Sequence, residues 1–530
     1  MLKSLLSLLS LLSLLSLLSL APNDARTQPT QETHLDFRTP TQTVEEQFLF
    51  LRKGIRAEYF SREVGQDWDQ MVFWPHGAAR PTHLIGCIEE VLDCLSGTCG
   101  ESFVVEDKLT PSVQVVDLQT RMVTTLVRGM TICDGIRTTP WGTVVATEED
   151  FVSDTGAVYE ILDPLTNDEF TILERGGGDA PARIVDQAGQ DASDRIIKRT
   201  AFPVIRYEGF LVHETGVVIA GDEERPGSYE PGDTDGGAVY KFIPTNLYDS
   251  AAGQIASLNQ SPLLAGTTYA LQVSCRDDLQ QFGQGCEIGN GAWVPLTPAV
   301  TSEVSLDVGA TRIGREAANA VGATGYYRPE DLHRDPMFSD PDQPDAVRFC
   351  FAVTGNHAGS NYGEVQCAID QDVTAATGAT GEIVVNRFVE GSPEFSQPDN
   401  LAFQPLTGVL FVVEDNGTSQ GNSDVWACLP DGADDDIKSD GCVRLLKIAD
   451  GSAESTGFVF TPDGTEAYFA IQHSADGNMP LVDDFQTDDL IRLSGFRVRP
   501  MKYDFGARTA YRLERQSYRY FGFGAENQIE

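Results

Sequence analysis

The segments Phe403-Gln-Pro-Leu-Thr-Gly-Val-Leu-Phe-Val-Val-Glu414 and Phe460-Thr-Pro-Asp-Gly-Thr-Glu-Ala-Tyr-Phe-Ala-Ile471 decide the fold class. Each runs from an apolar residue through a proline and a tight turn into an apolar strand. Such a unit is the hairpin of a propeller blade, and its recurrence indicates a repeated sheet. We therefore predict a mostly-β chain that folds as a single large β-propeller.

Other short apolar runs are bounded by Gly, Pro, Asp and Asn, as strands of all-β proteins are. Strands are expected at residues 113–117, 142–146, 216–220, 238–243, 347–353, 409–413 and 466–471. Helical periodicity is scarce, and its clearest case is 43–62, where Phe48, Leu51, Ile55 and Tyr59 could share one face. We expect about six blades with small helical decorations, of which 43–62 is one.

The two ends of the chain differ in composition from the rest. Residues 1–20 carry one cation, Lys3, before uncharged Leu-Leu-Ser units, which is typical of a signal peptide. This apolar run approaches the length of a membrane span, so a retained anchor is the alternative. Residues 21–43 are rich in Pro, Thr and Gln and are expected to be a flexible leader. The propeller domain is expected at 44–510 and a C-terminal tail at 511–530.

The formal net charge of −41 bears on the partners of the protein. Nucleic acid and anionic membranes recruit clusters of Lys and Arg, so neither is expected as a partner, apart from a membrane that holds a retained signal. The acidic residues have two interpretations, a solvated surface suited to saline surroundings or carboxylates gathered into calcium sites.

Ten cysteines in a chain with a secretory signal favour disulfide bonds. Local spacing predicts three pairs: Cys275 with Cys286, Cys350 with Cys367, and Cys428 with Cys442. Cys133 then remains with Cys87, Cys94 and Cys99. Two arrangements are open: two of the latter three pair and leave Cys133 free, or Cys133 bonds to the one that is left over, which spacing alone favours.

Polar side chains that bind metals follow four of the expected strands. They are Glu148, Glu149 and Asp150; Asp222, Glu223 and Glu224; Glu414 and Asp415; and Gln472 and His473. Equivalent strand ends of different blades meet at one end of the central channel. Carboxylates gathered there repel one another unless cations neutralise them, which predicts a multi-metal site. Taken singly, each acidic pair is more simply a solvated turn.

Ordered motifs between about Thr110 and Gly477 resemble the PhoX family of secreted alkaline phosphatases. They are Thr139-Pro-Trp-Gly-Thr143 with Glu148-Glu149, Phe210-Leu-Val-His-Glu214, Asp222-Glu223 with Gly236-Gly237, Arg328-Pro-Glu330, Gln397-Pro-Asp399-Asn400, and Phe460-Thr-Pro-Asp463 with Ile471-Gln472-His473. The resemblance implies a six-bladed propeller that hydrolyses phosphate monoesters at a centre of iron and calcium ions.

The resemblance also implies roles for particular residues. Cys133 stands where the family has a thiolate ligand to iron, Glu214 and Glu330 stand at carboxylate ligands, and Arg328 stands at the arginine that contacts phosphate. Further residues of the calcium or phosphate site are expected at Glu149, Asp399, Asn400 and Glu454, with Asn400 grouped with Arg328 as catalytic and the other three as metal ligands.

These residue types suit the chemistry of a phosphate monoester. Cations neutralise its oxygens and lower the pKa of bound water, and a guanidinium can donate hydrogen bonds to two of its oxygens at once. A thiolate favours iron over calcium. Without the motif, the simpler interpretation would be that Arg328 forms a surface ion pair with Glu330 or Asp331.

The chain also departs from the family pattern. It has no twin-arginine signal, Ala146 replaces a cysteine, and Gln397 stands where arginine is usual. The change at Ala146 could mark a cluster with altered metals.

We predict a secreted protein, extracellular or periplasmic, that acts as a monomer on small-molecule phosphate esters for phosphate scavenging. One alternative is a calcium-dependent propeller lactonase, which needs neither Arg328 nor a thiolate. The other is a non-catalytic propeller that uses calcium only for stability.

Overall fold

The computed structural model describes residues 43–90, 104–105, 108–149, 156–166, 168–176, 180–226, 236–273, 288–296, 313–415, 423–430, 438–473 and 479–498. The predicted signal peptide, nearly all of the leader, the C-terminal tail and the Cys275–Cys286 pair lie outside these residues. Within the described part of the chain, no helix is both long enough and apolar enough to cross a membrane.

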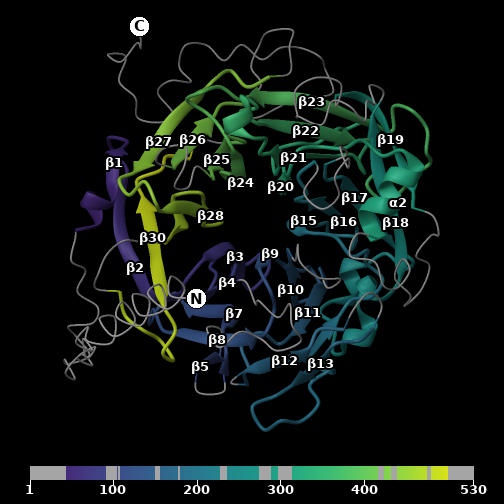
Figure 1. Ribbon diagram of the computed structural model, residues 1–530. Helices are drawn as coiled ribbons and strands as arrows, with labels where there is room; N and C mark the ends of the chain where they lie inside the picture. The colour runs from purple at the N-terminus through teal and green to yellow at the C-terminus, as the bar shows by residue number, and fades with distance from the viewer. Residues whose placement is uncertain are drawn as a thin grey trace, which may run out of the picture.

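The described strands form the six blades of a β-propeller around a central axis (Figure 1). From the axis outward, the first blade comprises β3 (Trp68–Trp74), β4 (His83–Ile88), β7 (Pro111–Asp117) and β8 (Val123–Arg128), and the second comprises β9 (Cys133–Thr138), β10 (Thr143–Glu148), β11 (Val158–Leu162) and β14 (Ile196–Lys198). The third comprises β15 (Tyr207–Val212), β16 (Val218–Asp222), β17 (Val239–Pro244) and β18 (Gly266–Val273), and the fourth comprises β20 (Pro329–Arg334), β21 (Val347–Val353), β22 (Glu364–Asp370) and β23 (Ile383–Glu390). The fifth comprises β24 (Pro398–Phe403), β25 (Leu410–Glu414), β26 (Asp424–Cys428) and β27 (Cys442–Ile448), and the sixth comprises β28 (Glu454–Phe460), β29 (Glu466–Gln472), β30 (Thr487–Ser494) and β2 (Arg56–Gly65).

Further strands extend the blades at their outer edges. β12 (Phe170–Glu174) and β13 (Arg183–Val185) lengthen the first blade, and β1 (Phe48–Leu51) lengthens the fifth. β19 (Gly289–Pro295) pairs with both β18 and β23 and so joins the third and fourth blades. The short β5 (Val104–Val105) and β6 (Lys108–Leu109) pair only with each other among the described strands.

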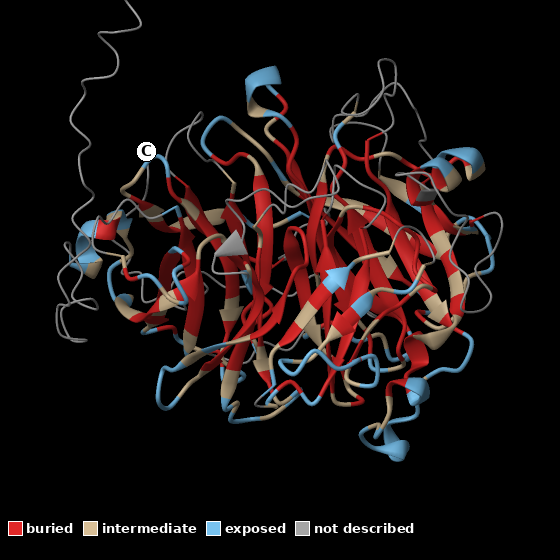
Figure 2. Cartoon of the chain, turned by 60° about the horizontal axis from the view of Figure 1, so that its bottom comes forward, coloured by how far each residue is buried: buried red, intermediate tan, exposed pale blue. Residues whose placement is uncertain are grey.

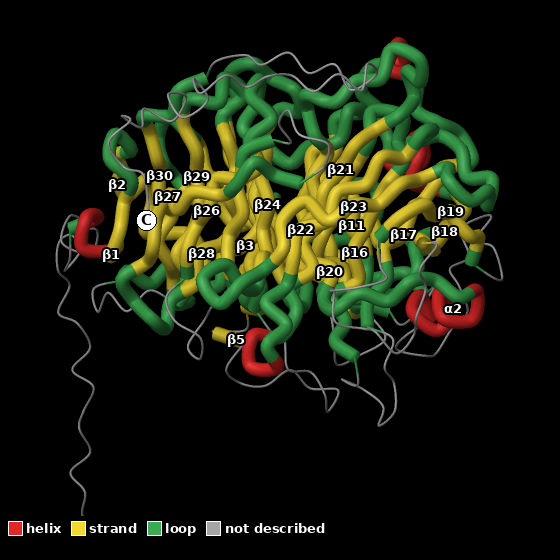
Figure 3. The backbone as a smooth tube through the Cα atoms, turned by 90° about the horizontal axis from the view of Figure 1, so that it is seen from above, coloured by secondary structure: helices red, strands yellow, loops and turns green. Residues whose placement is uncertain are grey.

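Helices lie outside the sheets, beside the strands and beyond both of their ends (Figure 3). They are α2 (Ile313–Val321) and the 3-10 turns η2 (Val44–Gln47), η4 (Ser250–Ala252), η5 (Leu258–Gln260), η6 (Pro262–Leu264) and η7 (His357–Gly359). The strands are largely buried, and exposed residues lie mostly in the turns (Figure 2).

Blades pack face to face through apolar side chains. Phe411 of β25 stacks on Phe458 of β28, with ring centroids 5.5 Å apart, and both rings are buried. Each blade is covered on both faces by the neighbouring blades. A strand inside a blade can therefore be apolar throughout rather than alternating, as the fully buried β25 shows. This explains why the sequence displayed short apolar runs, and each of the seven strands predicted from them is confirmed in β7, β10, β16, β17, β21, β25 or β29.

The helix predicted over residues 43–62 is wrong. The segment contains η2, β1 and the start of β2, which pairs antiparallel with β30 and completes the sixth blade. The buried guanidinium of Arg62 donates from Nε to Asp489 Oδ1 at 2.9 Å and fixes this pairing. Tertiary strand pairing therefore overrides a local helical period, because every backbone group of β2 that meets β30 gains a partner.

Candidate metal and phosphate site

The innermost strands of the blades are β3, β9, β15, β20, β24 and β28, and each contacts the next around the axis (Figure 1). In the first five, the second residue of the strand is acidic. These residues are Asp69, Asp134, Glu208, Glu330 and Asp399, and β28 has Ser455 at the same place. The repeat of the fold therefore brings five carboxylates from distant parts of the sequence to one level of the ring.

Two more carboxylates join this level from the second strands of their blades. Glu89 directly follows β4, and Glu149 directly follows β10. Ligand oxygens lie within 4.8 Å of one another in each of three groups: Asp69, Glu89 and Asp134; Asp134, Glu149 and Glu208; and Glu208, Glu330 and Asp399. Since neighbouring groups share a member, these seven residues form one continuous set, which we call the carboxylate row.

Glycines allow the inner strands to approach closely at this level. A Cβ atom at Gly135 of β9 would lie 2.5 Å from the backbone oxygen of Glu208. A Cβ at Gly209 of β15 would clash in the same way with the backbone oxygen of Glu330. Only glycine fits where the backbone of one blade meets the acidic residue of the next.

Burial and mutual repulsion raise the pKa values of the carboxylate row. Burial is the largest cause, followed for most members by the charges of neighbouring carboxylates. The pKa of Asp69 rises to about 7, and that of Glu330 rises to about 7 although Arg328 opposes the shift. Gathered acids of this kind are costly unless protons or cations neutralise them.

Two oxygens in the row have no hydrogen-bond donor among the described residues, which favours cations as their partners. Asp69 Oδ1 and Asp134 Oδ1 are buried and accept no hydrogen bond in the described structure. A buried polar atom with no partner loses its hydration without compensation. The acidic groups of the row could therefore bind metal ions, and their hard oxygen donors are of the type that Ca²⁺ prefers.

Arg328 lies beside the row, immediately before β20. It forms ion pairs with Glu223, with Glu330 at 2.9 Å and with Asp415 at 3.2 Å. The ion pair with Glu330 that the simpler interpretation expected is therefore formed, but it is not at the surface, because the Arg328 side chain is only 12% exposed. The three carboxylates raise the pKa of Arg328 despite its burial, and the guanidinium stays charged at the edge of the row.

Predicted metal ligands Glu149, Glu330 and Asp399 lie in the row. Asn400, predicted to be catalytic, is buried beside it, where its Oδ1 accepts from Gly457 N at 2.5 Å and its Nδ2 faces Asp399 Oδ1 at 3.3 Å. Glu454 begins β28 and belongs to none of the three groups. Burial, with the charges of Asp415 and Asp69, nevertheless raises its pKa strongly, which places it electrostatically next to the row.

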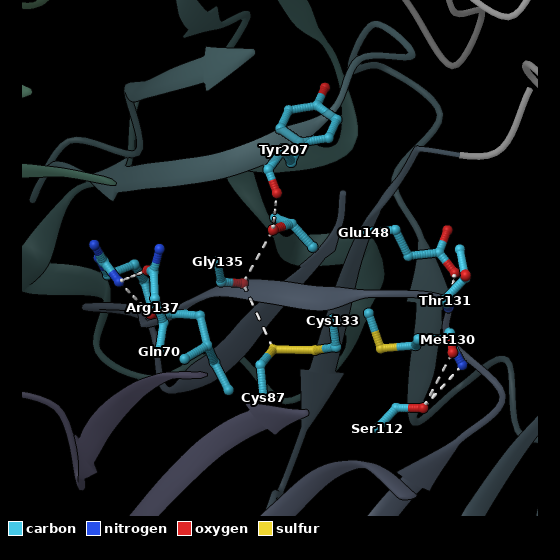
Figure 4. Close-up of a disulfide and its surroundings, with 12 residues drawn as sticks. Gln70, Cys87, Ser112, Met130, Thr131, Cys133, Gly135, Arg137, Glu148 and Tyr207 are labelled. Carbon is cyan, nitrogen blue, oxygen red and sulfur yellow. Dashed lines mark hydrogen bonds between the residues drawn. A yellow bond between two sulfur atoms is a disulfide. The ribbon is translucent and has the colours of Figure 1, made fainter. Parts of the chain in front are cut away.

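Two of the predicted ligands lie elsewhere, and Cys133 is the first. It forms a disulfide with Cys87, and both cysteines pack in an apolar core that includes Val72 and Ile85 (Figure 4). Because side chains alternate along a strand, Asp134 faces the row while Cys133 points away from it. The prediction of a free thiolate ligand is therefore contradicted, and the alternative that Cys133 pairs with one of the upstream cysteines is confirmed.

Glu214 is the second predicted ligand that the structure separates from the row. It lies two residues beyond the other end of β15, its side chain is 65% exposed, and it pairs with Arg334 at 2.9 Å. Glu208, at the start of β15, is the residue of this strand that reaches the row.

Sequence reasoning missed Glu208, Glu89, Asp69 and Asp134. Glu89-Glu90 follow an apolar strand just as Glu148-Glu149 do, so the pattern used for the four strand ends could have found Glu89. Asp69, Asp134 and Glu208 are single acidic residues, each the second residue of an innermost strand. They can be identified only when the bounds of that strand are known.

The family described as alkaline phosphatase PhoX matches residues 130–475, more than half of the chain. This chain belongs to the PhoX family. The match includes five members of the carboxylate row, whereas Asp69 and Glu89 precede it.

One solved structure supports the fold, and two others are more distantly similar. PhoX of Pseudomonas fluorescens in complex with vanadate, a transition state analogue, has a TM-score of 0.53 at 16% identity and covers 86% of this chain and 97% of its own. A luciferin-regenerating enzyme has a TM-score of 0.36 at 10% identity, covering 84% and 98% of the two chains. A gluconolactonase from Xanthomonas campestris has a TM-score of 0.33 at 12% identity, covering 86% and 93%. No curated protein matches the chain in sequence.

Two of the three departures from the family pattern, Ala146 and Gln397, lie within the described residues. Ala146 is buried in the core of β10. Gln397 directly precedes β24, as Arg328 precedes β20, and its Nε2 donates to the backbone oxygen of Asp415 at 2.5 Å. Gln397 therefore supplies an uncharged donor at a position where the preceding blade has the cation of Arg328.

Proposed function

We propose that this protein is a secreted, metal-dependent alkaline phosphatase that hydrolyses phosphate monoesters and serves in phosphate scavenging. One observation supports this most directly: a buried row of seven carboxylates lies in contact with the charged Arg328. The row suits cations, and the arginine suits an anion held against those cations. The natural substrates are small-molecule phosphate esters, and the protein acts as a monomer.

Calcium is the cation that fits the donors best. The row offers only carboxylate oxygens, and bound cations would neutralise phosphoryl oxygens and lower the pKa of a coordinated water. Iron bound by a thiolate does not fit, because the Cys133 sulfur bonds to Cys87. If iron is present, the carboxylates of the row hold it.

Arg328 and Asn400 are proposed to contact the substrate. The planar guanidinium of Arg328 can donate two parallel hydrogen bonds to phosphoryl oxygens. Asn400 contributes its amide group from β24, next to Asp399. Glu149, Glu208, Glu330 and Asp399 orient the cations, and Glu454 adds negative charge from the sixth blade.

Disulfides support export to an oxidising compartment. Cys87–Cys133, Cys350–Cys367 and Cys428–Cys442 are formed within the described residues. Such bonds persist outside the reducing cytosol. Together with the predicted signal peptide, they favour an extracellular or periplasmic location.

The change Arg328→Ala tests the proposal. We expect turnover of p-nitrophenyl phosphate to fall by about 100-fold or more while calcium remains bound, because a donor to the transition state is lost. Arg334→Ala is the matched control, since Arg334 ends the same strand and pairs with the exposed Glu214. Full turnover by the Arg328→Ala variant would refute the phosphate role.

Chelation and alternative substrates separate the other candidates. A lactonase would hydrolyse lactones and leave phosphomonoesters intact, and a binding propeller would hydrolyse neither. If calcium serves only stability, its removal unfolds the protein; if it serves catalysis, activity disappears while far-ultraviolet circular dichroism persists at low temperature.

A further inference from the structure

The motif Arg-x-Glu occurs at the start of two neighbouring inner strands. Arg206-Tyr207-Glu208 leads into β15, and Arg328-Pro329-Glu330 leads into β20. In each, the arginine directly precedes the strand and the glutamate is a member of the carboxylate row. The blade repeat therefore puts Arg206 in the position, one blade earlier, that Arg328 occupies.

One carboxylate holds both arginines. Glu223 Oε2 lies 2.6 Å from Arg206 Nη2, and Glu223 Oε1 pairs with Arg328 Nε. Its two oxygens thus pair with different arginines, and this arrangement holds the two guanidiniums close together. The side chains of Arg206 and Arg328 are each 12% exposed, so neither is completely buried.

Each arginine also pairs with a different member of the row. Arg206 Nη2 lies 2.5 Å from Glu149 Oε1, and Arg328 Nη2 lies 2.9 Å from Glu330 Oε1. A cation held by Glu149 or Glu330 would neutralise part of the charge of that carboxylate and weaken its ion pair with the arginine. The N–H groups of the guanidinium would then be available to donate hydrogen bonds to an anionic ligand. Glu223 belongs to none of the three metal-binding groups and keeps the guanidiniums side by side.

We propose that Arg206 is a second phosphoryl-binding residue, which forms a clamp with Arg328, and that Glu223 is the positioning residue of this clamp. The inference rests on the proposed phosphatase function and adds a preference for phosphomonoesters over phosphodiesters. Two arginines match the two negative charges of a phosphomonoester dianion, whereas a diester carries one charge and has a second substituent in place of an oxygen. The clamp therefore selects terminal phosphoryl groups.

The experiment compares Arg206→Gln, Arg206→Lys and Arg328→Gln in the full-length, calcium-loaded protein. Three quantities are measured: inhibition by inorganic phosphate, and kcat/KM for p-nitrophenyl phosphate and for bis(p-nitrophenyl) phosphate. For Arg206→Gln we expect inhibition by phosphate to weaken about tenfold or more. The monoester-to-diester ratio of kcat/KM should fall by a similar factor. Arg206→Lys should restore part of the phosphate inhibition and of this ratio, because lysine keeps the positive charge but lacks the planar guanidinium.

Arg225→Gln is the matched control. Arg225 also pairs with Glu223, at 3.6 Å, but its side chain is 50% exposed, and we expect its loss to change neither quantity. A merely structural role of Arg206 would lower activity toward both esters equally and leave the ratio unchanged.

Unchanged phosphate inhibition and ester ratio in Arg206→Gln, with both reduced in Arg328→Gln, would overturn the inference and leave the proposed function intact. A wild-type protein that neither hydrolyses the monoester nor binds phosphate would overturn the proposed function itself. If thermal unfolding shows that Arg206→Gln is not folded, Arg206→Lys decides, and wild-type behaviour of that variant counts against the clamp.

Discussion

Glu208 and Glu214 show how strongly one residue's place on a strand determines what it can do. Both flank β15, yet Glu208 is buried among the carboxylates and Glu214 is 65% exposed beside Arg334. The motif that suggested Glu214 lies within the correct strand, but at its outer end. A sequence motif therefore identifies the strand more reliably than it identifies which end of the strand lies at the level of the carboxylate row.

We predict that Glu208→Gln lowers calcium affinity and phosphatase activity by about 100-fold or more, because Glu208 belongs to two of the three carboxylate groups that could hold a metal ion. Glu214→Gln should leave both within about twofold. Isothermal titration with Ca²⁺ and p-nitrophenyl phosphate turnover measure the two effects. The assignment is wrong if the two variants exchange behaviour.

At the scale of elements, the sequence predicted the blades better than the row. Apolar runs and turn residues identified β25 and β29 because a doubly covered strand has a strong local signature. The ligand Asp134 has none, since it is one acid beside Cys133 in an otherwise ordinary strand. The pairing of Cys133 with Cys87 depends on β4 and β9 lying together in space, which no local pattern reports.

The Cys87–Cys133 bond also connects two elements that supply row carboxylates. Cys87 stands two residues before Glu89, and Cys133 directly precedes Asp134. We therefore predict that the double change Cys87→Ala with Cys133→Ala weakens calcium binding by about tenfold, because Glu89 and Asp134 lose a fixed separation.

The double change Cys350→Ala with Cys367→Ala is the control, since that disulfide joins β21 to β22 outside the row. Its effect should be confined to a lower melting temperature. Equal calcium affinity in the two double variants would show that the Cys87–Cys133 bond does not position ligands.

At the scale of the whole molecule, the buried carboxylates make the stability of the protein depend on pH, because they cannot all be charged at once. In the metal-free protein, the pKa values of Asp69 and Glu330 lie at about 7, above their ordinary values near 4. The folded state then binds protons more tightly than the unfolded state between these limits. Stability is therefore highest at the acidic end of this window and decreases as pH rises through it.

We predict that the melting temperature of the chelated protein falls by roughly several degrees between pH 5 and pH 8, and that calcium abolishes the fall. Differential scanning calorimetry with and without chelator measures it. The variant Asp69→Asn with Glu330→Gln should show a shallower dependence. A chelated wild type that becomes more stable as pH rises would contradict the raised pKa values.

The pairing of β2 with β30 determines when the molecule can be completed. Arg62 and Asp489, whose side chains join these strands, are 427 positions apart in the sequence. During synthesis, a segment made early must wait for one made almost last before the sixth blade has its outer strand. Until then, β2 lacks its partner β30, and the sixth blade, which contacts the first through β28 and β3, is incomplete. Closure of the ring therefore depends on segments from both ends of the described chain.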